Sequence, residues 1–142
     1  MQTQNFKNHT QWVPGFHFGV YGGIAILLGG AIIYHAHVTE ENKYAAALLV
    51  FMPFVLIGLA LYARSFALKA QDRAIRAEEK LRYYIMTGQP MDSRLRTSQI
   101  VALRFAGDEE FVELVKKAAA ENLRSKEIKM LIQNWKADYH RV

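Results

Sequence analysis

The sequence contains no cysteine in its 142 residues. Disulfide bonds, thiolate metal sites and cysteine nucleophiles are therefore excluded. The redox compartment stays open, because a cysteine-free chain is compatible with either environment.

Charged residues are lacking from two long windows. No Lys, Arg, Asp or Glu stands between Lys7 and Glu40, and none stands in YAAALLVFMPFVLIGLALYA, from Tyr44 to Ala63. A helix over this second window would reach about 30 Å, the thickness of the hydrocarbon core of a bilayer. We therefore predict two membrane spans, at about residues 18–35 and 44–63. No cleavable signal peptide is expected, since the first apolar run follows a long segment with a single lysine and is not followed by a convincing small-x-small cleavage site.

The charges are concentrated after the second window. From Arg64 onward the chain holds 16 of its 18 Lys and Arg and 11 of its 13 Asp and Glu, so the whole formal excess of +5 lies there. The loop between the spans is short and net acidic, which predicts an antiparallel transmembrane hairpin (17–63). Because positive residues favour the cytoplasmic side, both termini are expected in the cytoplasm. Four basic residues are predicted to meet the membrane surface: Arg64, Lys69, Arg73 and Arg76.

Proline is rare, with three residues in the chain. The pair Pro14-Gly15 predicts the end of a polar N-terminal tail (1–16). Pro53 stands within the second span and predicts a structural kink. Pro90 follows Gly88, which predicts that the second helix ends at residue 87.

No Gly or Pro interrupts residues 64–87, so the second span is expected to continue as a long cytoplasmic helix. Its small and apolar residues repeat at 3-4 spacing, which indicates a heptad seam that continues back through Ala63, Ala60, Leu56 and Pro53. The seam consists of Ala67, Ala70, Ala74, Ala77, Leu81 and Tyr84. Asp72 with Arg76, and Glu78 with Arg82, are expected to form i,i+4 ion pairs. Such an alanine-rich seam requires a close helical partner.

Glycine is frequent in the first span and at its start. Close spacing of Gly15, Gly19, Gly23 and Gly30 predicts a packing face, because small residues let a partner helix approach closely. The partner could be the second span, a second copy or another protein, and the alternative is that glycine is simply common in membrane helices.

The C-terminal segment (88–142) is expected to form three short helices. The first covers about Thr97 to Ala106. The second is capped by Asp108, with Glu109 and Glu110 in its first turn, where the helix dipole favours anions. The third is capped by Ser125 and has an apolar face of Ile128, Leu131, Ile132 and Trp135. With fewer than 60 residues its core is marginal, so docking on the long helix or on a partner is expected. The predicted fold class is all-α.

Three stretches of the chain resemble a family of small bacterial two-span membrane proteins of unknown function. They are AQDRAIRAEEKLRYYIMTGQ, QIVALRFAGDEEFVELV and IKMLIQNWKADYHRV, and the N-terminal QNFKNHT is similar to the start of that family. The resemblance implies the same hairpin and helical tail, in the bacterial inner membrane. It implies no catalytic or binding residue.

Histidine is the remaining candidate for a site. His17 stands at the entry of the first span, and His35 and His37 stand at its exit, where imidazole could ligate haem, chlorophyll or a metal. However, residues two apart point in different directions on a helix, so His35 and His37 cannot chelate one ion. The alternative is hydrogen bonding to water or headgroups. No cofactor is therefore predicted.

Enzymatic chemistry has little support. Glu109 and Glu110 could suggest a catalytic carboxylate pair, but the dipole at the start of a helix explains both. The two spans contain no ionisable carboxylate, Lys or Arg, so they do not support an ion relay through the membrane. Nucleic-acid binding is not expected, because the third C-terminal helix has no strongly basic face. We predict a non-enzymatic accessory or scaffold subunit that binds lipid and either other membrane-protein subunits or itself. The alternative is a histidine-ligated haem or chlorophyll subunit of a respiratory or photosynthetic assembly.

Overall fold

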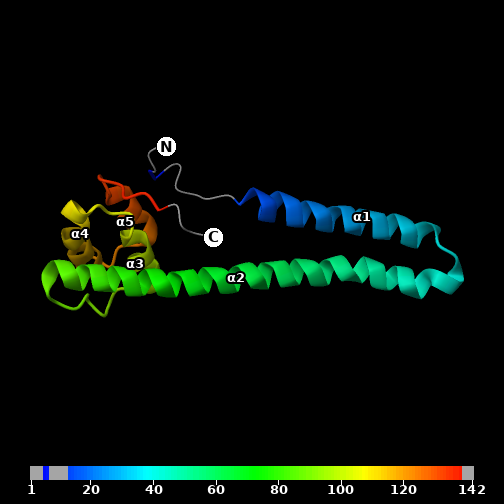
Figure 1. Ribbon diagram of the computed structural model, residues 1–142, viewed down its shortest axis with the longest axis horizontal. Coiled ribbons are helices and arrows are strands. Elements are labelled where there is room, and N and C mark those ends of the chain that lie inside the picture. Colours follow the sequence, from blue (N-terminus) through cyan, green and yellow to red (C-terminus); the bar gives the residue numbers. More distant parts are fainter. Residues whose placement is uncertain (1–4, 7–12, 139–142) are drawn as a thin grey trace. The chain divides into compact units, whose positions relative to one another are not determined.

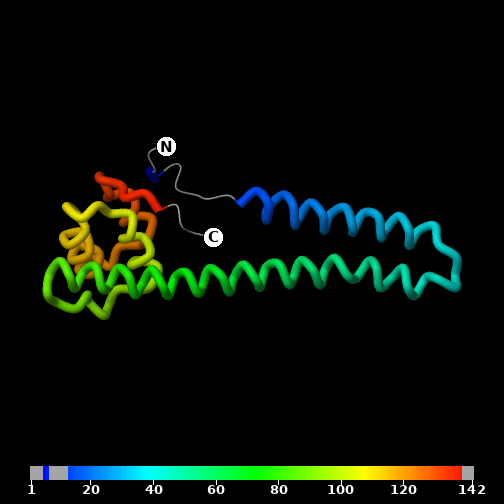
Figure 2. The backbone as a smooth tube through the Cα atoms, viewed as in Figure 1, coloured from blue at the N-terminus to red at the C-terminus, as the bar shows by residue number. Residues whose placement is uncertain are grey.

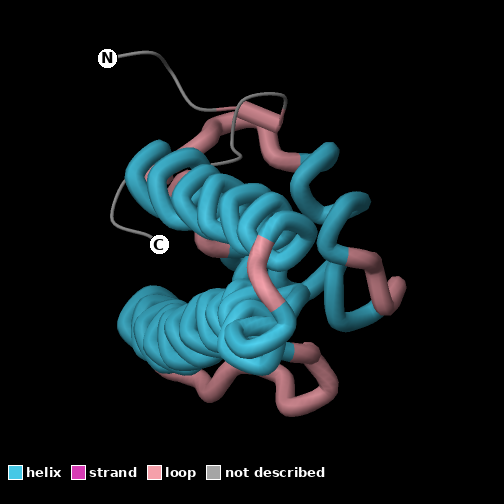
Figure 3. The backbone as a smooth tube through the Cα atoms, turned by 90° about the vertical axis from the view of Figure 1, so that its right-hand side faces the viewer, coloured by secondary structure: helices cyan, strands magenta, loops and turns pink. Residues whose placement is uncertain are grey.

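The computed structural model describes residues 5–6 and 13–138, and within these ranges the chain is helical with no strand (Figures 1 and 3). The predicted all-α class is confirmed. In chain order the elements are the π-helical turn η1 (Gly15–Val20), α1 (Tyr21–His37), the 3-10 turn η2 (Glu40–Asn42), α2 (Lys43–Thr87), α3 (Thr97–Leu103), α4 (Asp108–Ala120) and α5 (Ser125–Leu131).

Two helical stretches are long and apolar enough to cross a membrane, judged by length and composition: Gly15–His37 and Glu40–Thr87. Their large apolar side chains are mostly exposed, among them Phe18, Ile26, Phe51 and Leu59. Apolar surface of this extent is unfavourable in water, whereas hydrocarbon would cover it at no such cost. This supports a membrane location.

Helix α2 is unbroken over 45 residues, although Pro53 stands inside it (Figure 2). Proline has no N–H to donate within a helix, and here its ring is fully buried. The helix ends as predicted, because Gly88 takes a positive φ of 68° and its N–H donates to the Tyr84 carbonyl at 2.8 Å. Glycine adopts this left-handed conformation without the steric cost that a Cβ would bring.

The chain divides into two compact units, and the division falls inside α2. One unit covers residues 12–67 and contains α1 and the apolar half of α2. The other combines residues 1–11 with residues 68–142, and it contains the charged half of α2 and the helices α3 to α5. Of the predicted N-terminal tail (1–16), only residues 5–6 and 13–16 are among the described residues.

The first unit buries few side chains. Ile24 on α1 and Ala46, Pro53 and Ala60 on α2 are buried. These three positions of α2 are seven residues apart, so the buried face repeats with a heptad period. A shallow apolar hollow of about 390 Å³ lies between the two helices and is lined by Ile26, Leu27, Gly30, Ala31, Tyr34, Leu49, Met52 and Pro53.

The second unit contains the main hydrophobic core. Helix α2 contributes Tyr83, whose ring meets Phe111 of α4 edge-on at 6.4 Å between centroids. The other fully buried large side chains include Ile100, Leu103, Phe105 and Ile128. The expectation that the C-terminal helices dock on the long helix is met within this unit, since a core side chain comes from α2 itself.

Both predicted helix caps are displaced by one residue. Gly107 and Arg124 are the N-caps, while Asp108 and Ser125 are the first helical residues. At α5 the Glu127 carboxylate accepts from the Arg124 backbone N–H at 2.6 Å. Since arginine has no acceptor atom, its side chain cannot complete a capping box. Ser125 instead donates its hydroxyl to the Ser98 carbonyl at 2.8 Å, which joins α5 to α3.

The third C-terminal helix is shorter than predicted. It ends at Leu131, and Ile132 is already extended, so Trp135 does not belong to the helical face. The extended segment pairs with the chain between α3 and α4: the Gly107 N–H donates to the Asn134 carbonyl at 2.8 Å, and the Lys136 N–H donates to the Phe105 carbonyl at 2.8 Å. These bonds compensate for the helical ones that are lost, and Trp135 still packs beside the core on Phe105.

Candidate functional site

The predicted heptad seam is exposed along the charged half of α2. Ala67 is half-buried, whereas Ala70, Ala74 and Ala77 are exposed. Leu81 is 59% exposed and Tyr84 is 55% exposed. Within the second unit this face is therefore largely uncovered by the described residues, and Ala74 alone of these seam residues lines a hollow with Arg104 and Asp138.

A different face of the same helix holds the C-terminal helices. Ile75, Glu79 and Tyr83 are buried, and at 3.6 residues per turn they lie roughly 160° around the helix from the centre of the seam. The charged half of α2 therefore uses one side within the second unit and presents the nearly opposite side to the surroundings.

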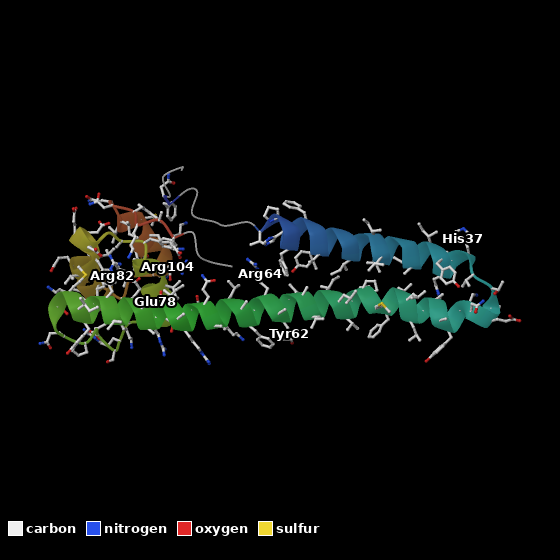
Figure 4. All side chains as sticks on the ribbon, viewed as in Figure 1. His37, Tyr62, Arg64, Glu78, Arg82 and Arg104 are labelled. Atoms are coloured by element: carbon white, nitrogen blue, oxygen red, sulfur yellow. The ribbon has the colours of Figure 1, made fainter. Side chains whose placement is uncertain are left out.

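Arg82 is the main polar link between α2 and the C-terminal helices (Figure 4). Its guanidinium donates to the Glu79 carboxylate at 3.0 Å, to the Asp108 carboxylate at 2.9 Å and to the Ala106 carbonyl at 2.9 Å. It also lies 4.0 Å from the centre of the Phe111 ring, within cation–π range. The hydrogen bond from Arg82 lowers the pKa of the Asp108 carboxyl.

This arrangement corrects one predicted ion pair. Arg82 does not pair with Glu78, because its side chain turns toward Glu79 and across to α4. Glu78 is exposed and has no ion-pair partner among the described residues. No pair between Asp72 and Arg76 forms among them either.

Apolar side chains widen the seam at the end of α2. Ile85 is 73% exposed and stands beside Leu81 and Tyr84 on the helix. A hollow of about 400 Å³ adjoins these residues and is lined by Glu78, Leu81, Arg82, Ile85, Met86 and Asp108. Large apolar side chains are thus exposed where the chain is otherwise charged, which is typical of a protein-binding surface.

A second hollow, of about 380 Å³, has mixed charge. Its lining includes the cations Arg104 and Lys136 and the carboxylates of Glu78, Glu79 and Asp138. Arg104 is buried and its Nε lies 3.0 Å from the Asp138 carboxylate. Because cations and carboxylates both line the hollow, its lining does not favour a ligand of one charge.

The glycine face of η1 and α1 makes no close contact with another helix among the described residues. A Cβ added at Gly15, Gly19, Gly23 or Gly30 would meet no atom within 4 Å. The partner of this glycine face, whether the second span, a second copy or another protein, remains a prediction.

The three candidate histidines do not converge on one site. Nδ1 of His17 lies 2.9 Å from the Val13 carbonyl oxygen, and Nδ1 of His37 lies 2.9 Å from the Ile33 carbonyl oxygen. His35 is exposed on the same helix as His37. Within the described ranges no three residues among His, Asp and Glu form a group that could hold a metal ion.

The predicted basic residues follow the apolar half of α2. Lys69, Arg73 and Arg76 are exposed, and Arg64 is half-buried with its guanidinium 5.5 Å from the centre of the Phe16 ring. This contact joins Arg64, the first charged residue after the second predicted span, to Phe16 in η1. Phe16 and Arg64 thus lie at the same end of the first unit.

Comparison with known proteins gives a family but no function. A family model described as a family of unknown function, DUF6526, matches residues 1–142. No curated protein and no solved structure matches the chain. The predicted resemblance to an uncharacterised family is confirmed along the whole chain.

Proposed function

The chain belongs to the family of unknown function DUF6526, and we propose that it is a non-enzymatic accessory or scaffold subunit of a larger membrane complex. One observation carries this proposal: Leu81, Tyr84 and Ile85 expose large apolar surface on a helix that has already passed its apolar, lipid-suited stretch. Lipid would not cover this surface, so burial against protein is the favourable alternative.

We further propose that the two apolar helices form a transmembrane hairpin in the bacterial inner membrane, with both termini in the cytoplasm. The short link η2 supports antiparallel spans, since α1 ends at His37 and α2 begins at Lys43. The cluster of Arg64, Lys69, Arg73 and Arg76 supports a cytoplasmic position for the charged half of α2.

Co-purification of the full-length protein in mild detergent, followed by mass spectrometry, tests the accessory role. We expect specific membrane-protein subunits to co-purify with the natural chain and to be lost from the variant Leu81→Glu/Ile85→Glu, which places charge on the exposed apolar face. Lys117→Glu is the control, because it also introduces a carboxylate at an exposed position of the second unit, but on α4 and away from the seam. Retention of the same subunits by the double variant would contradict the proposed surface, and a chain that purifies with no other subunit would contradict the accessory role.

The second candidate is a haem or chlorophyll subunit ligated by His17 or His35. One observation favours His17: its Nδ1 lies 2.9 Å from the Val13 carbonyl oxygen, and a contact of this kind orients the imidazole ring of a metal ligand. An absorption spectrum of the purified protein decides this candidate. A Soret or chlorophyll band that disappears in His17→Ala would support it, and a colourless natural protein would eliminate it.

A further inference from the structure

We propose that the exposed seam of α2 binds a second copy of this chain, so that two charged halves of α2 form a parallel coiled coil. This inference rests on the proposed function and deepens it, because it names the partner of the same surface. In heptad terms Ala67, Ala74 and Leu81 take position a, and Ala70, Ala77 and Tyr84 take position d.

The exposure of the seam makes such pairing accessible. The C-terminal helices pack mainly on the nearly opposite face of α2, through Ile75, Glu79 and Tyr83. Residues 136–138 reach the edge of the seam, where they line a hollow with Ala74 and Glu78, and both of these residues are still exposed. Alanine at four consecutive a and d positions lets two helices approach closely. Leu81 and Tyr84 then supply most of the apolar area, at the end of the seam farthest from the apolar span.

The flanking charges indicate a second copy rather than an arbitrary helix. Positions g are Arg73 and Lys80, and positions e are Gln71, Glu78 and Ile85. In a parallel pair, g of one helix faces the e position five residues later on its partner. Arg73 therefore faces Glu78 of the second copy, and the symmetry of the dimer forms this pair twice. Lys80 faces Ile85, where its aliphatic stem can cover the exposed apolar side chain.

The structure leaves these charges available. Arg73 and Glu78 are both exposed, and neither forms an ion pair within the described part of the chain. Glu78 lines a hollow with Arg104 and Lys136, but it forms no ion pair with them, and Arg82 has turned to Glu79 and Asp108. Because Arg82 pairs with Glu79 and Asp108, the Glu78 carboxylate stands at the edge of the seam without an ion pair to any other described residue.

The same charges disfavour the antiparallel alternative. In an antiparallel pair g faces g, which would bring Arg73 of one chain near Lys80 of the other. Like charges across an interface are unfavourable and select against that arrangement. Membrane insertion with one topology would also hold two copies parallel and raise their effective concentration.

Cysteine crosslinking of the full-length protein in membrane vesicles tests the seam directly, because the chain has no cysteine of its own. We expect Ala77→Cys and Leu81→Cys to give disulfide-linked dimers under mild oxidation. Arg76→Cys is the matched control, since it is exposed and adjacent to residue 77 but points away from the seam. Equal crosslinking at residues 76 and 77, or crosslinking of residue 77 to a different protein alone, would overturn the proposal.

Charge reversal tests the identity of the partner. We expect Arg73→Glu or Glu78→Arg to weaken the dimer about tenfold, equivalent to about 1.4 kcal/mol, and the double variant to restore it. Failure of the double variant to recover would overturn the assigned pairing, and unchanged helix content by circular dichroism would show that each variant still folds.

Crosslinked dimers without co-purifying subunits would overturn the accessory role alone, whereas co-purifying subunits without crosslinks would overturn the dimer alone.

Discussion

Arg82 shows at the scale of one residue how a surface-type amino acid can become part of the structure. Its side chain is 13% exposed, and it joins two carboxylates, one carbonyl oxygen and the face of Phe111. Guanidinium presents several N–H donors in a fixed plane, so it can serve these acceptors at once. Lysine could not reproduce this set of contacts.

Replacement of Arg82 by alanine is expected to destabilise the second unit. The Glu79 carboxylate is nearly buried, and removal of the charge that pairs with it costs about 3 kcal/mol by analogy with broken buried pairs. Chemical or thermal unfolding of the detergent-solubilised protein measures the change. Lys117→Ala is the control, since residue 117 is an exposed cation of the same unit that lies on α4. Equal stability of the two variants would contradict the structural role of Arg82.

The same contact predicts a pH dependence. Because Arg82 lowers the pKa of Asp108 from 3.8 in the folded chain, the unfolded chain binds more protons in acid. The contribution of Asp108 to stability is therefore present above about pH 4 and is lost as the pH falls through the folded pKa. The free energy of unfolding, measured as a function of pH in the acid range, should lack the contribution of Asp108 in the variant Arg82→Ala. An unchanged acid profile in that variant would contradict the assignment.

At the scale of elements, α4 organises the segment that follows α5. The Glu110 carboxylate accepts the backbone N–H groups of Gln133 and Asn134, at 3.1 and 2.9 Å. Gly107 allows the close approach of this segment, since a Cβ there would lie 3.0 Å from the Asn134 carbonyl oxygen. The helix dipole explains an acid in the first turn, but the structure shows that this acid also binds another segment.

Glu110→Ala is expected to release the extended segment without unfolding α4. Each hydrogen bond to a charged acceptor contributes about 1.5 kcal/mol, so the amides of Gln133 and Asn134 should exchange about tenfold faster. Hydrogen exchange measured by NMR or mass spectrometry checks this. Glu113→Ala is the matched control, because Glu113 pairs with Lys116 on the exposed side of the same helix. Similar exchange in both variants would show that Glu110 does not hold the segment.

At the scale of the whole molecule, the proposed topology places the link between the apolar helices outside the cytoplasm. Single cysteines again provide the measurement in a chain without cysteine. Glu41→Cys should react with a membrane-impermeant maleimide in cells whose outer membrane alone is opened, and Asn122→Cys should react only after the inner membrane is permeabilised. The reverse pattern would contradict the positive-inside assignment.

Much of the architecture could be read from local patterns. The charge-free windows and the 3-4 spacing predicted the helices, because lipid spans and helical faces need only neighbours along the chain. Gly88 predicted the end of α2 for the same local reason. The third C-terminal helix was overestimated because the apolar spacing of Ile128 to Trp135 fits a helix equally well. Nothing local reveals that residues 134–136 find backbone partners at residues 105–107.

The seam of α2 likewise has features that depend on the sequence alone and features that depend on the tertiary structure. The sequence by itself determined that α2 carries a seam, since periodicity is a property of the chain alone. Only the tertiary structure decided where that seam is left exposed: Pro53 and Ala60 of its backward continuation are buried, whereas the seam residues Ala70, Ala74, Ala77, Leu81 and Tyr84 are exposed. The tertiary structure also decided that Arg82 binds Glu79 and Asp108 instead of Glu78. The physical reason is that burial and ion pairing depend on which distant segments meet, and helical spacing contains no information about distant segments.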